Sequence, residues 1–167
     1  MSRHRVLAMV AAAACGAWPL MLLGGGDAGA APAARGAVPA AGSWGRAMAV
    51  PGLGILNQGE HAQVFQISCG SPGNCAAGGF YRDRHGHGHG FVVSERDGSW
   101  GRAIGVPGLR ALNQGDTAQV YSVSCASAGY CAAGGFYTDG DGHGQGFVVS
   151  ERNGVWGRAL EVPGLGT

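Results

Sequence analysis

An internal repeat constrains the fold of this chain more than any other sequence feature. The segment that begins at Ser124 reads SCASAGYCAAGGFYTDGDGHGQGFVVSERNGVWGRALEVPGL, and the one that begins at Ser68 reads SCGSPGNCAAGGFYRDRHGHGHGFVVSERDGSWGRAIGVPGL. Trp44, Trp100 and Trp156 mark the same place in successive copies, 56 residues apart each time. A fixed period of this length is typical of bladed β-sheet or solenoid architectures, in which each repeat is one structural unit. The repeat therefore predicts the architecture, but it carries no chemistry by itself.

Composition indicates a folded protein and argues against some partners. Hydrophobic residues make up 46% of the 167 residues and charged residues only 13%, which is typical of a chain that buries a core. The 34 glycines recur at the same places in both copies, which favours turns and close sheet packing over a flexible linker. The formal net charge is +1, all basic residues are arginines and no basic cluster stands out. We therefore expect neither nucleic acid nor an acidic membrane surface as a partner.

The N-terminal segment has the pattern of a secretory signal peptide. Arg3 and Arg5 give it a positive start, residues 6–23 are mostly apolar, and residues 28–30 read Ala-Gly-Ala. A basic start, an apolar stretch and a small-residue site are the three parts that signal peptidase substrates share. We expect cleavage after Ala30, export from a bacterial cell and an extracellular mature protein without a membrane segment.

Two other interpretations of this segment stay open. The apolar run is close to the ~18 residues that can cross a bilayer, but Pro19 and the glycines after it interrupt the run, so an uncleaved anchor fits less well. A lipoprotein acylated at Cys15 fits least, because apolar residues continue beyond that cysteine. The preferred interpretation divides the chain into a signal peptide, a short Ala/Pro/Gly linker and a β-repeat domain, over residues 1–30, 31–41 and 42–167, with repeats at 42–97, 98–153 and, incomplete, 154–167.

Four cysteines remain once the leader is removed, and they form one C-x5-C pair in each repeat. An even number at repeated spacing in an exported chain indicates disulfides, and the simplest of the three possible connectivities joins Cys69 to Cys75 and Cys125 to Cys131. A zinc site is the weaker alternative, because zinc knuckles favour two to four intervening residues. Each bridge would close a short loop, so we expect it to stabilise the fold by less than the ~3 kcal/mol of a 15-residue loop.

Each repeat divides into four extended pieces. Segments 63–69 and 119–125 alternate with a period of two, which predicts strands with Phe65 and Ile67 on one face and Val64 on the other. The pieces CAAGGFY, GFVVSER and then SWGRA or VWGRA follow in order. Together they predict an all-β fold made of tandem four-stranded antiparallel repeats.

Two dipeptides predict tight hairpins between the third and fourth pieces. Asp97-Gly98 and Asn153-Gly154 separate extended runs, and this kind of dipeptide is favoured in two-residue type I′ turns because both residues need a positive φ. The turns fix which residues lie opposite each other in the two strands they join.

One face of each hairpin then brings together a carboxylate, an indole and a guanidinium. A two-residue loop places Glu95 opposite Trp100 and diagonal to Arg102, and the second copy repeats this set as Glu151, Trp156 and Arg158. The glutamates fit cross-strand partners of arginine, worth roughly 0.2–1 kcal/mol each, better than catalytic acids, because no second carboxylate adjoins either one. The tryptophans fit sheet packing better than a sugar-stacking platform. We therefore expect no catalytic residue here.

The order of these motifs resembles a known family. The combination SC-x5-CAAGGFY-x-D, then GFVVSER-[DN]-G-x-WG and VPGL, is similar to the cysteine-paired β-propeller-type repeats of exported bacterial proteins, which usually occur as longer arrays. Four strands in about fifty residues match a propeller blade. The resemblance covers residues 42–167 and implies a partial β-propeller of two blades plus one extra strand. It implies no single activity, cofactor or catalytic residue.

Histidines alternate with glycines in the first copy, at His85, His87 and His89. If this segment is extended, the three imidazoles project from one face about 7 Å apart, and imidazole suits zinc, copper or nickel. The second copy offers a mixed oxygen and nitrogen set, at Asp139, Asp141 and His143. A solvated hairpin loop is the simpler alternative, because glycine-rich flanks do not preorganise a site. Zinc or copper binding at the four histidines His85, His87, His89 and His143 is thus a hypothesis, and no other cofactor is expected.

The sequence contains no familiar catalytic motif. G-x-S-x-G, H-E-x-x-H, a phosphate-binding loop and C-x-x-C are all missing from it. We expect a secreted non-enzymatic module whose repeated loops bind a glycan, a peptide or the cell surface. The alternative is a subunit or truncated remnant of an exported hydrolase, with Asp83 and Asp139 as acids at the loop edge.

Two blades would leave two apolar faces uncovered. Closed propellers use about four to eight blades, so we expect a homodimer or homotrimer that completes a ring, with the WGRALEVPGL segment free to pair with another subunit. The alternative is a shortened descendant of a longer array, with an exposed edge near Thr167 that promotes aggregation.

Overall fold

The computed structural model describes residues 45–165. The expected signal peptide, its cleavage site after Ala30, Cys15 and the linker lie outside the described residues. Strands dominate the described part and its two helices are single turns, so the all-β class is confirmed. The elements, in chain order, are α1 (Leu53–Leu56), β1 (Ala62–Ser71), β2 (Asn74–Arg82), β3 (Gly88–Arg96), β4 (Ser99–Trp100), β5 (Ile104–Gly105), α2 (Leu109–Leu112), β6 (Ala118–Ser127), β7 (Tyr130–Thr138), β8 (Gly144–Arg152), β9 (Val155–Trp156) and β10 (Leu160–Glu161).

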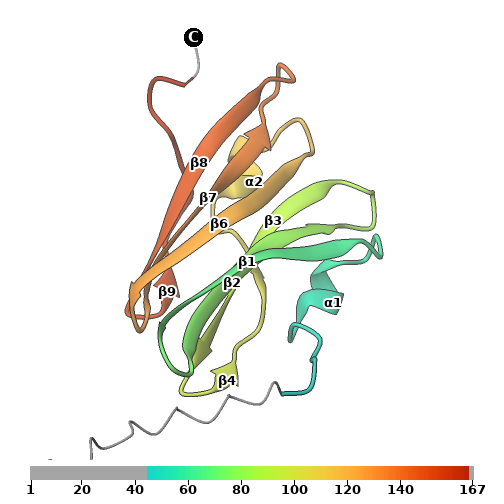
Figure 1. The fold of residues 1–167 in the computed structure, drawn as a ribbon. Coiled ribbons are helices and arrows are strands. Elements are labelled where there is room, and N and C mark those ends of the chain that lie inside the picture. Colours follow the sequence, from blue (N-terminus) through green and yellow to red (C-terminus); the bar gives the residue numbers. More distant parts are fainter. Residues whose placement is uncertain (1–44, 166–167) are drawn as a thin grey trace, which may run out of the picture. The chain divides into compact units, whose positions relative to one another are not determined.

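The strands form two antiparallel sheets built on one plan (Figure 1). In the first sheet β1, β2 and β3 are neighbours in order, and β4 and β5 both pair with β3. In the second sheet β6, β7 and β8 are neighbours, and β9 and β10 both pair with β8. The first three strands of each sheet follow one another in the chain and are hydrogen-bonded in that order, as in a propeller blade. The predicted tandem antiparallel repeats are therefore confirmed.

The fourth piece of each repeat is two short strands, not one. β4 and β5 are separated by three residues, and their pairs with β3 are Glu95 with Trp100 and Val92 with Ile104. In the second sheet β10 pairs Leu160 with Val148 of β8. The WGRALEVPGL segment thus supplies the two outer strands of the second sheet of its own chain, and its pairing with another subunit stays a prediction.

The predicted hairpin turns are confirmed. Asp97 and Gly98 have φ of 48° and 79°, and Asn153 and Gly154 have φ of 51° and 70°. Both residues of each turn therefore have the positive φ that a type I′ turn requires. The register that follows is also as expected, with each glutamate opposite its tryptophan.

The simple alternation expected in the first strand of each repeat is wrong, because a β-bulge interrupts it. The register of β6 shifts between Val120 and Ser122, and the extra residue, Tyr121, is 52% exposed. Val120 and Val123 both face the core, with at most 1% of their surface exposed. A bulge adds one residue to one strand and so reverses the face of every residue after it.

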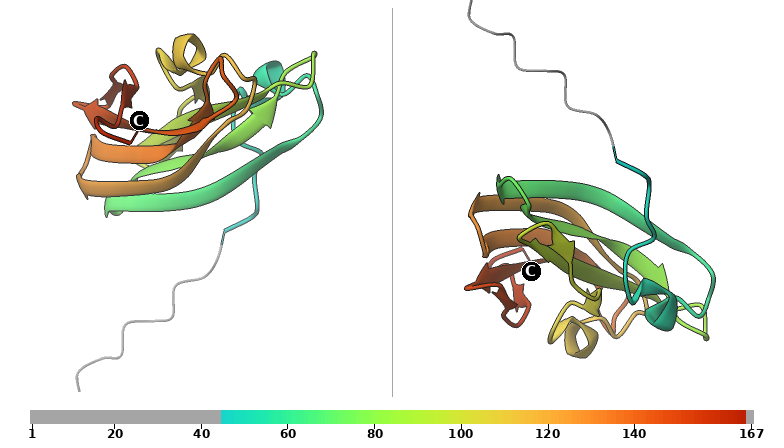
Figure 2. Two further views of the ribbon diagram at one scale, coloured as in Figure 1. Left: turned by 90° about the horizontal axis from the view of Figure 1, so that it is seen from above. Right: turned by 90° about the horizontal axis from the view of Figure 1, so that it is seen from below.

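The two sheets pack face to face, and the main core lies between them (Figures 1 and 2). Strand β6 lies against β1, β2 and β3 of the first sheet. Gly78 of β2 marks a close approach, since a Cβ atom there would lie 2.5 Å from Cγ1 of Val120. The core between the sheets contains Ala76, Val92, Val106, Leu109, Ala118, Val120, Val123, Cys131, Ala133, Tyr137, Phe147, Val149, Trp156 and Ala159. A smaller cluster, Ala77, Phe91, Val93 and Ala103, lies on the opposite face of the first sheet.

Both predicted disulfides are present. Cys69 is bonded to Cys75 and Cys125 to Cys131, each between the paired first two strands of its sheet. Two intramolecular disulfides are compatible with an extracellular location. Within residues 45–165, neither helix has the length or apolar character needed to cross a bilayer.

Candidate functional site

The histidine run lies in the hairpin that joins β2 to β3, and only its last part is extended. The chain turns at Arg84 to Gly86, where Gly86 has a φ of 83°, and β3 begins at Gly88. His89 is in β3, paired with Tyr81 of β2. The expectation that three imidazoles line one face of an extended segment is therefore wrong, because His85 lies in the turn.

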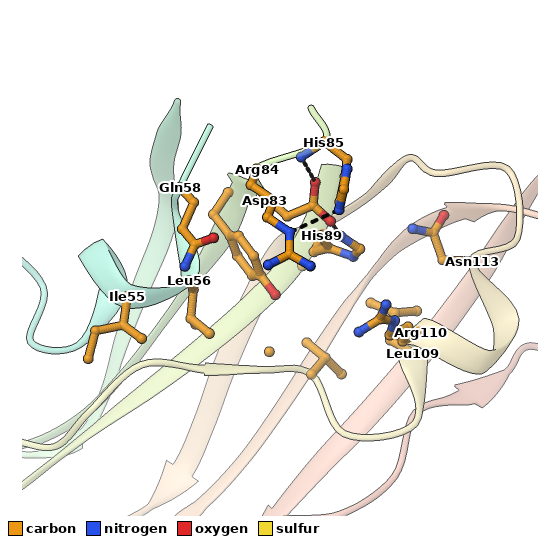
Figure 3. A pocket seen from close by; sticks show the side chains of 14 residues that line it. Ile55, Leu56, Gln58, Asp83, Arg84, His85, His89, Leu109, Arg110 and Asn113 are labelled. Atoms are coloured by element: carbon orange, nitrogen blue, oxygen red, sulfur yellow. Dashed lines mark hydrogen bonds and ion pairs between the residues drawn. The ribbon is translucent and has the colours of Figure 1, made fainter. Parts of the chain in front are cut away.

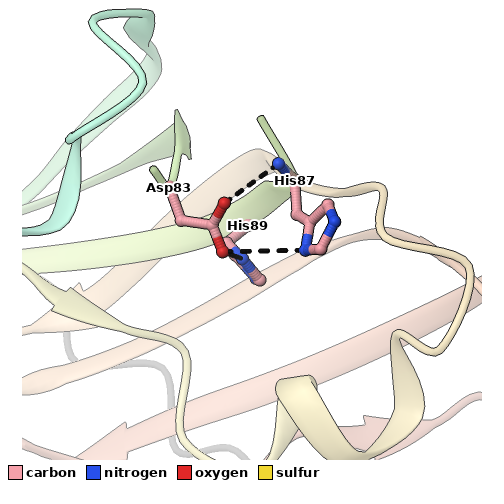
Figure 4. Close-up of side chains that lie close together, drawn as sticks. All are labelled: Asp83, His87 and His89. Atoms are coloured by element: carbon pink, nitrogen blue, oxygen red, sulfur yellow. Dashed lines mark hydrogen bonds and ion pairs between the residues drawn. The ribbon is translucent and has the colours of Figure 1, made fainter. Parts of the chain in front are cut away.

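Asp83, His87 and His89 converge at the base of this hairpin (Figure 4). Their nearest ligand atoms all lie within 4.8 Å of one another. Nε2 of His89 is 3.0 Å from Oδ2 of Asp83, and Nδ1 of His87 is 3.7 Å from the same oxygen. Two imidazole nitrogens and one carboxylate oxygen thus face a common point. His85 lies outside this group, and its Nε2 accepts a hydrogen bond from Nε of Arg84.

The two carboxylate oxygens of Asp83 have different contacts. Oδ1 accepts hydrogen bonds from the backbone N–H groups of His85 and His87, at 2.8 and 3.0 Å, and holds the turn. Oδ2 faces the two imidazoles. Partial burial raises the pKa of Asp83, but the hydrogen bond with His89 and those from the two backbone N–H groups outweigh it and lower the pKa to about 2. The carboxylate is therefore ionised throughout the physiological range.

A loop of the second repeat completes the surroundings of His87. Nδ1 of His87 lies 3.4 Å from Oδ1 of Asp116. The backbone N–H of Gly88 donates to the carbonyl oxygen of Asp116 at 2.8 Å, and Nδ2 of the buried Asn113 donates to the carbonyl oxygen of Gly88 at 3.1 Å. The hairpin of the first repeat is thereby fixed to the second repeat.

The matching hairpin of the second repeat has the same frame with different side chains. Oδ1 of Asp139 accepts the backbone N–H groups of Asp141 and His143, at 3.0 and 2.9 Å. Gln145 stands where the first repeat has His89, and its Nε2 donates to Oδ2 of Asp139 at 3.0 Å. This bond and the backbone N–H of His143 lower the pKa of Asp139. Asp139, Asp141 and His143 form a second group of neighbouring ligand atoms, more exposed than the first.

A pocket of about 390 Å³ opens beside the first hairpin (Figure 3). Asp83 and His89 line one side, and Arg110 of α2 lines another. Burial, and then the charge of Asp83, raise the pKa of Tyr81 in its wall, while Arg110 acts in the opposite direction. The pocket therefore offers a carboxylate, imidazoles, a neutral phenol and a guanidinium to a polar ligand.

The glutamates of the two hairpins do not pair with arginine. No arginine in residues 45–165 lies within 4.0 Å of a carboxylate oxygen. Instead Glu151 is 3% exposed and Oε1 accepts a hydrogen bond of 2.6 Å from Oγ of Ser94, which in turn accepts Nε1–H of Trp156 at 2.9 Å. This network crosses between the sheets, so Glu151 is a packing residue and the expected arginine partner is wrong.

Sequence reasoning missed the participation of Asp83 and Asp116 at the histidines and of Ser94 at the sheet junction. A signal for Asp83 existed, because FY-x-D stands in both copies just before the histidine run. Asp116 and Ser94 gave no comparable signal, since each contacts a residue of the other repeat.

No known family model, curated protein or solved structure matches this chain, so its function has to be inferred from its own geometry.

Proposed function

We propose that this chain is an exported, non-enzymatic β-repeat module that assembles with copies of itself through its two uncovered sheet faces, as an extracellular structural or binding unit. One observation carries the proposal. Residues that are buried where the two sheets meet have repeat counterparts that are exposed at the two ends of the stack. The leader pattern and the two disulfides support export.

The first uncovered surface, which we call the β1 face, consists of Val64, Ile67 and Trp100. Val64 and Ile67 are 46% and 56% exposed, whereas their counterparts Val120 and Val123 are 0% and 1% exposed at the sheet junction. The β1 face surrounds a hollow of about 190 Å³ with an apolar lining that also includes Ala77 and Val93. The counterparts of these five residues, in the second sheet, share one core with Val92 of the first sheet. At a free face, the hollow therefore repeats the side chains that share a buried core with Val92 at the junction.

The second uncovered surface, which we call the β8 face, carries the matching valine. Val148 is 47% exposed and Leu165 is 62% exposed, whereas their counterparts Val92 and Leu109 are 0% and 3% exposed. Within one chain, Val92 and Leu109 pack against the second sheet. Val148 and Leu165 on the β8 face of one copy can therefore pack in the same way against the β1 face of another copy. Contacts of this kind join different surfaces, so they form rings when the rotation closes.

Polar groups of the junction are also repeated at both free faces. Ser150, the counterpart of Ser94, is exposed on β8. Within one chain Ser94 forms hydrogen bonds with Glu151 and Trp156. We expect Ser150 of one copy to form the same bonds with Glu95 and Trp100 of another copy.

One position differs between the junction and the free faces. Gly70 approaches the backbone of Ser127 so closely that a Cβ atom would lie 2.2 Å from it, and its counterpart is Ala126. The hairpin tip that carries Ala126 must shift slightly when two copies meet.

The acids favour a binding or structural module over the hydrolase alternative. A general acid needs a raised pKa to hold its proton near neutral pH, whereas the pKa values of Asp83 and Asp139 are both lowered. Two blades per chain make a homodimer or homotrimer the assembly that completes a four- or six-bladed ring. The pocket beside the first hairpin is where we expect a glycan or peptide ligand.

The test uses single charged substitutions on each face of the oxidised mature protein. Val64→Glu and Val148→Glu each leave one face intact, so each variant alone should be monomeric by light scattering. When the two variants are mixed in equal amounts, the intact β8 face of Val64→Glu should bind the intact β1 face of Val148→Glu. The mixture should then contain heterodimers and nothing larger. Ile55→Glu is the matched control, because Ile55 is 61% exposed and its counterpart Ala111 is exposed too; it should assemble like the unmodified protein.

A discrete oligomer with this pattern supports the proposal. A well-folded monomer of the unmodified protein, or two variants that remain monomeric when mixed, would show that the free faces do not bind each other. Heterogeneous aggregates that persist in both variants would instead support the truncated-array alternative.

A further inference from the structure

We propose that Asp83, His87 and His89 bind a divalent transition-metal ion such as Zn²⁺, with Asp116 of the second repeat beside the same ion. The inference does not depend on self-assembly, because all four residues belong to one chain. It revises the set that the sequence suggested, since it brings in two aspartates and leaves out His85 and His143.

The separations of the donor atoms suit a small metal ion. Ligands at about 2.0–2.1 Å from zinc in a tetrahedral site are roughly 3.3 Å from each other. The observed separations are 3.0 Å between Asp83 Oδ2 and His89 Nε2, 3.7 Å between Asp83 Oδ2 and His87 Nδ1, and 3.4 Å between His87 Nδ1 and Asp116 Oδ1. The donor atoms of Asp83, His87 and His89 all lie within 4.8 Å of one another, and Asp116 joins this group through its contact with His87. Two imidazoles with carboxylate oxygens suit zinc, copper or nickel better than calcium or magnesium.

The hairpin is preorganised without a bound ion, even though glycines flank its histidines. Gly88 and Gly90 are buried within β3, on either side of His89. Oδ1 of Asp83 is held by two backbone N–H groups, which leaves Oδ2 directed at the imidazoles. A ligand whose second oxygen is fixed in this way loses little freedom on binding.

The site is open to solvent on one side. The side chains of His87 and Asp116 are 43% and 55% exposed, whereas those of His89 and Asp83 are 15% and 24% exposed. An ion can therefore enter over His87 and Asp116 and reach the more buried pair. Because Asp116 belongs to the loop before β6, a bound ion would link the two repeats and should raise the stability of the junction between the sheets.

The second repeat supplies a natural control substitution. Gln145 makes with Asp139 the hydrogen bond that His89 makes with Asp83, at the same 3.0 Å. His89→Gln should therefore keep the hairpin and remove one metal ligand. Conversely, Gln145→His gives the second hairpin a second imidazole beside Asp139 and His143, and should create a weaker second site.

The experiment is titration of Zn²⁺ into the metal-free, oxidised mature protein, followed by calorimetry and by melting temperature. We expect one ion per chain with micromolar affinity and a higher melting temperature with zinc. His89→Gln should weaken binding at least tenfold and abolish the zinc-dependent shift, with an unchanged melting temperature in the absence of zinc. His85→Ala should bind like the unmodified protein, because His85 lies outside the group.

Three results would overturn the proposal. The first is no binding of Zn²⁺ by the unmodified protein below millimolar concentration. The second is equal affinity in His89→Gln and the unmodified protein. The third is loss of binding in His85→Ala with retention in His89→Gln, which would place the ion on the turn instead.

Discussion

Ser94→Ala should destabilise the junction between the sheets more than its size suggests. Oγ of Ser94 donates to Glu151 and accepts from Trp156, and both partners are buried, with 3% and 8% of their surface exposed. The substitution leaves a buried carboxyl group and an indole N–H without a partner. Leaving a buried polar group unsatisfied costs about 1–3 kcal/mol, and more for a charged group, so we expect a loss of about 2–4 kcal/mol in the free energy of unfolding.

The assay is urea unfolding followed by tryptophan fluorescence, in a Val64→Glu background so that self-assembly does not contribute. Ser150→Ala is the matched control, because Ser150 is exposed and should change the monomer by no more than about 0.5 kcal/mol. The same control should weaken assembly in the unmodified background, where Ser150 lies at the proposed interface. If Ser94→Ala and Ser150→Ala have equal effects on the monomer, the hydrogen-bond network does not stabilise the junction and this reasoning fails.

Two further predictions concern the sheets and the hairpin. Gly78→Ala should cost about 1–3 kcal/mol through overpacking, because its Cβ would lie 2.5 Å from Val120. Gly134→Ala should be tolerated in the monomer, since the nearest atom to its Cβ would be 3.4 Å away. Thermal unfolding of the two variants checks this, and an equal loss of stability in both would contradict the observed sheet packing. The folded-state pKa of Asp83, about 2, is below its ordinary value near 3.9, so its contribution to stability is present above pH 4 and is lost as the pH falls towards 2. Asp83→Asn should therefore lose less stability than the unmodified protein between pH 5 and pH 2 in urea unfolding, and identical pH profiles would refute the lowered pKa.

The sequence by itself determined those features that depend on neighbours within one repeat. Asp97-Gly98 predicts its turn because few dipeptides accept two positive φ values, and the turn then fixes Glu95 opposite Trp100. The C-x5-C spacing, repeated in both copies, predicts Cys69 with Cys75, and the two cysteines are paired beside the turn between β1 and β2. Repetition of these local rules was enough to predict two similar antiparallel sheets.

Features that arise between repeats could be decided only by the tertiary structure. Val64 and Val120 are the same residue at the same repeat position, yet one is 46% exposed and the other 0%, because within residues 45–165 only Val120 has a sheet packed over it. Asp116 approaches His87 from a loop 29 residues later in the chain, and Ser94 reaches Glu151 across 57 residues. Phe65 and Tyr121 leave the expected face because a bulge adds one residue to each strand. In each case the deciding contact depends on how one sheet lies on its neighbour, and the sequence of a single repeat does not contain that information.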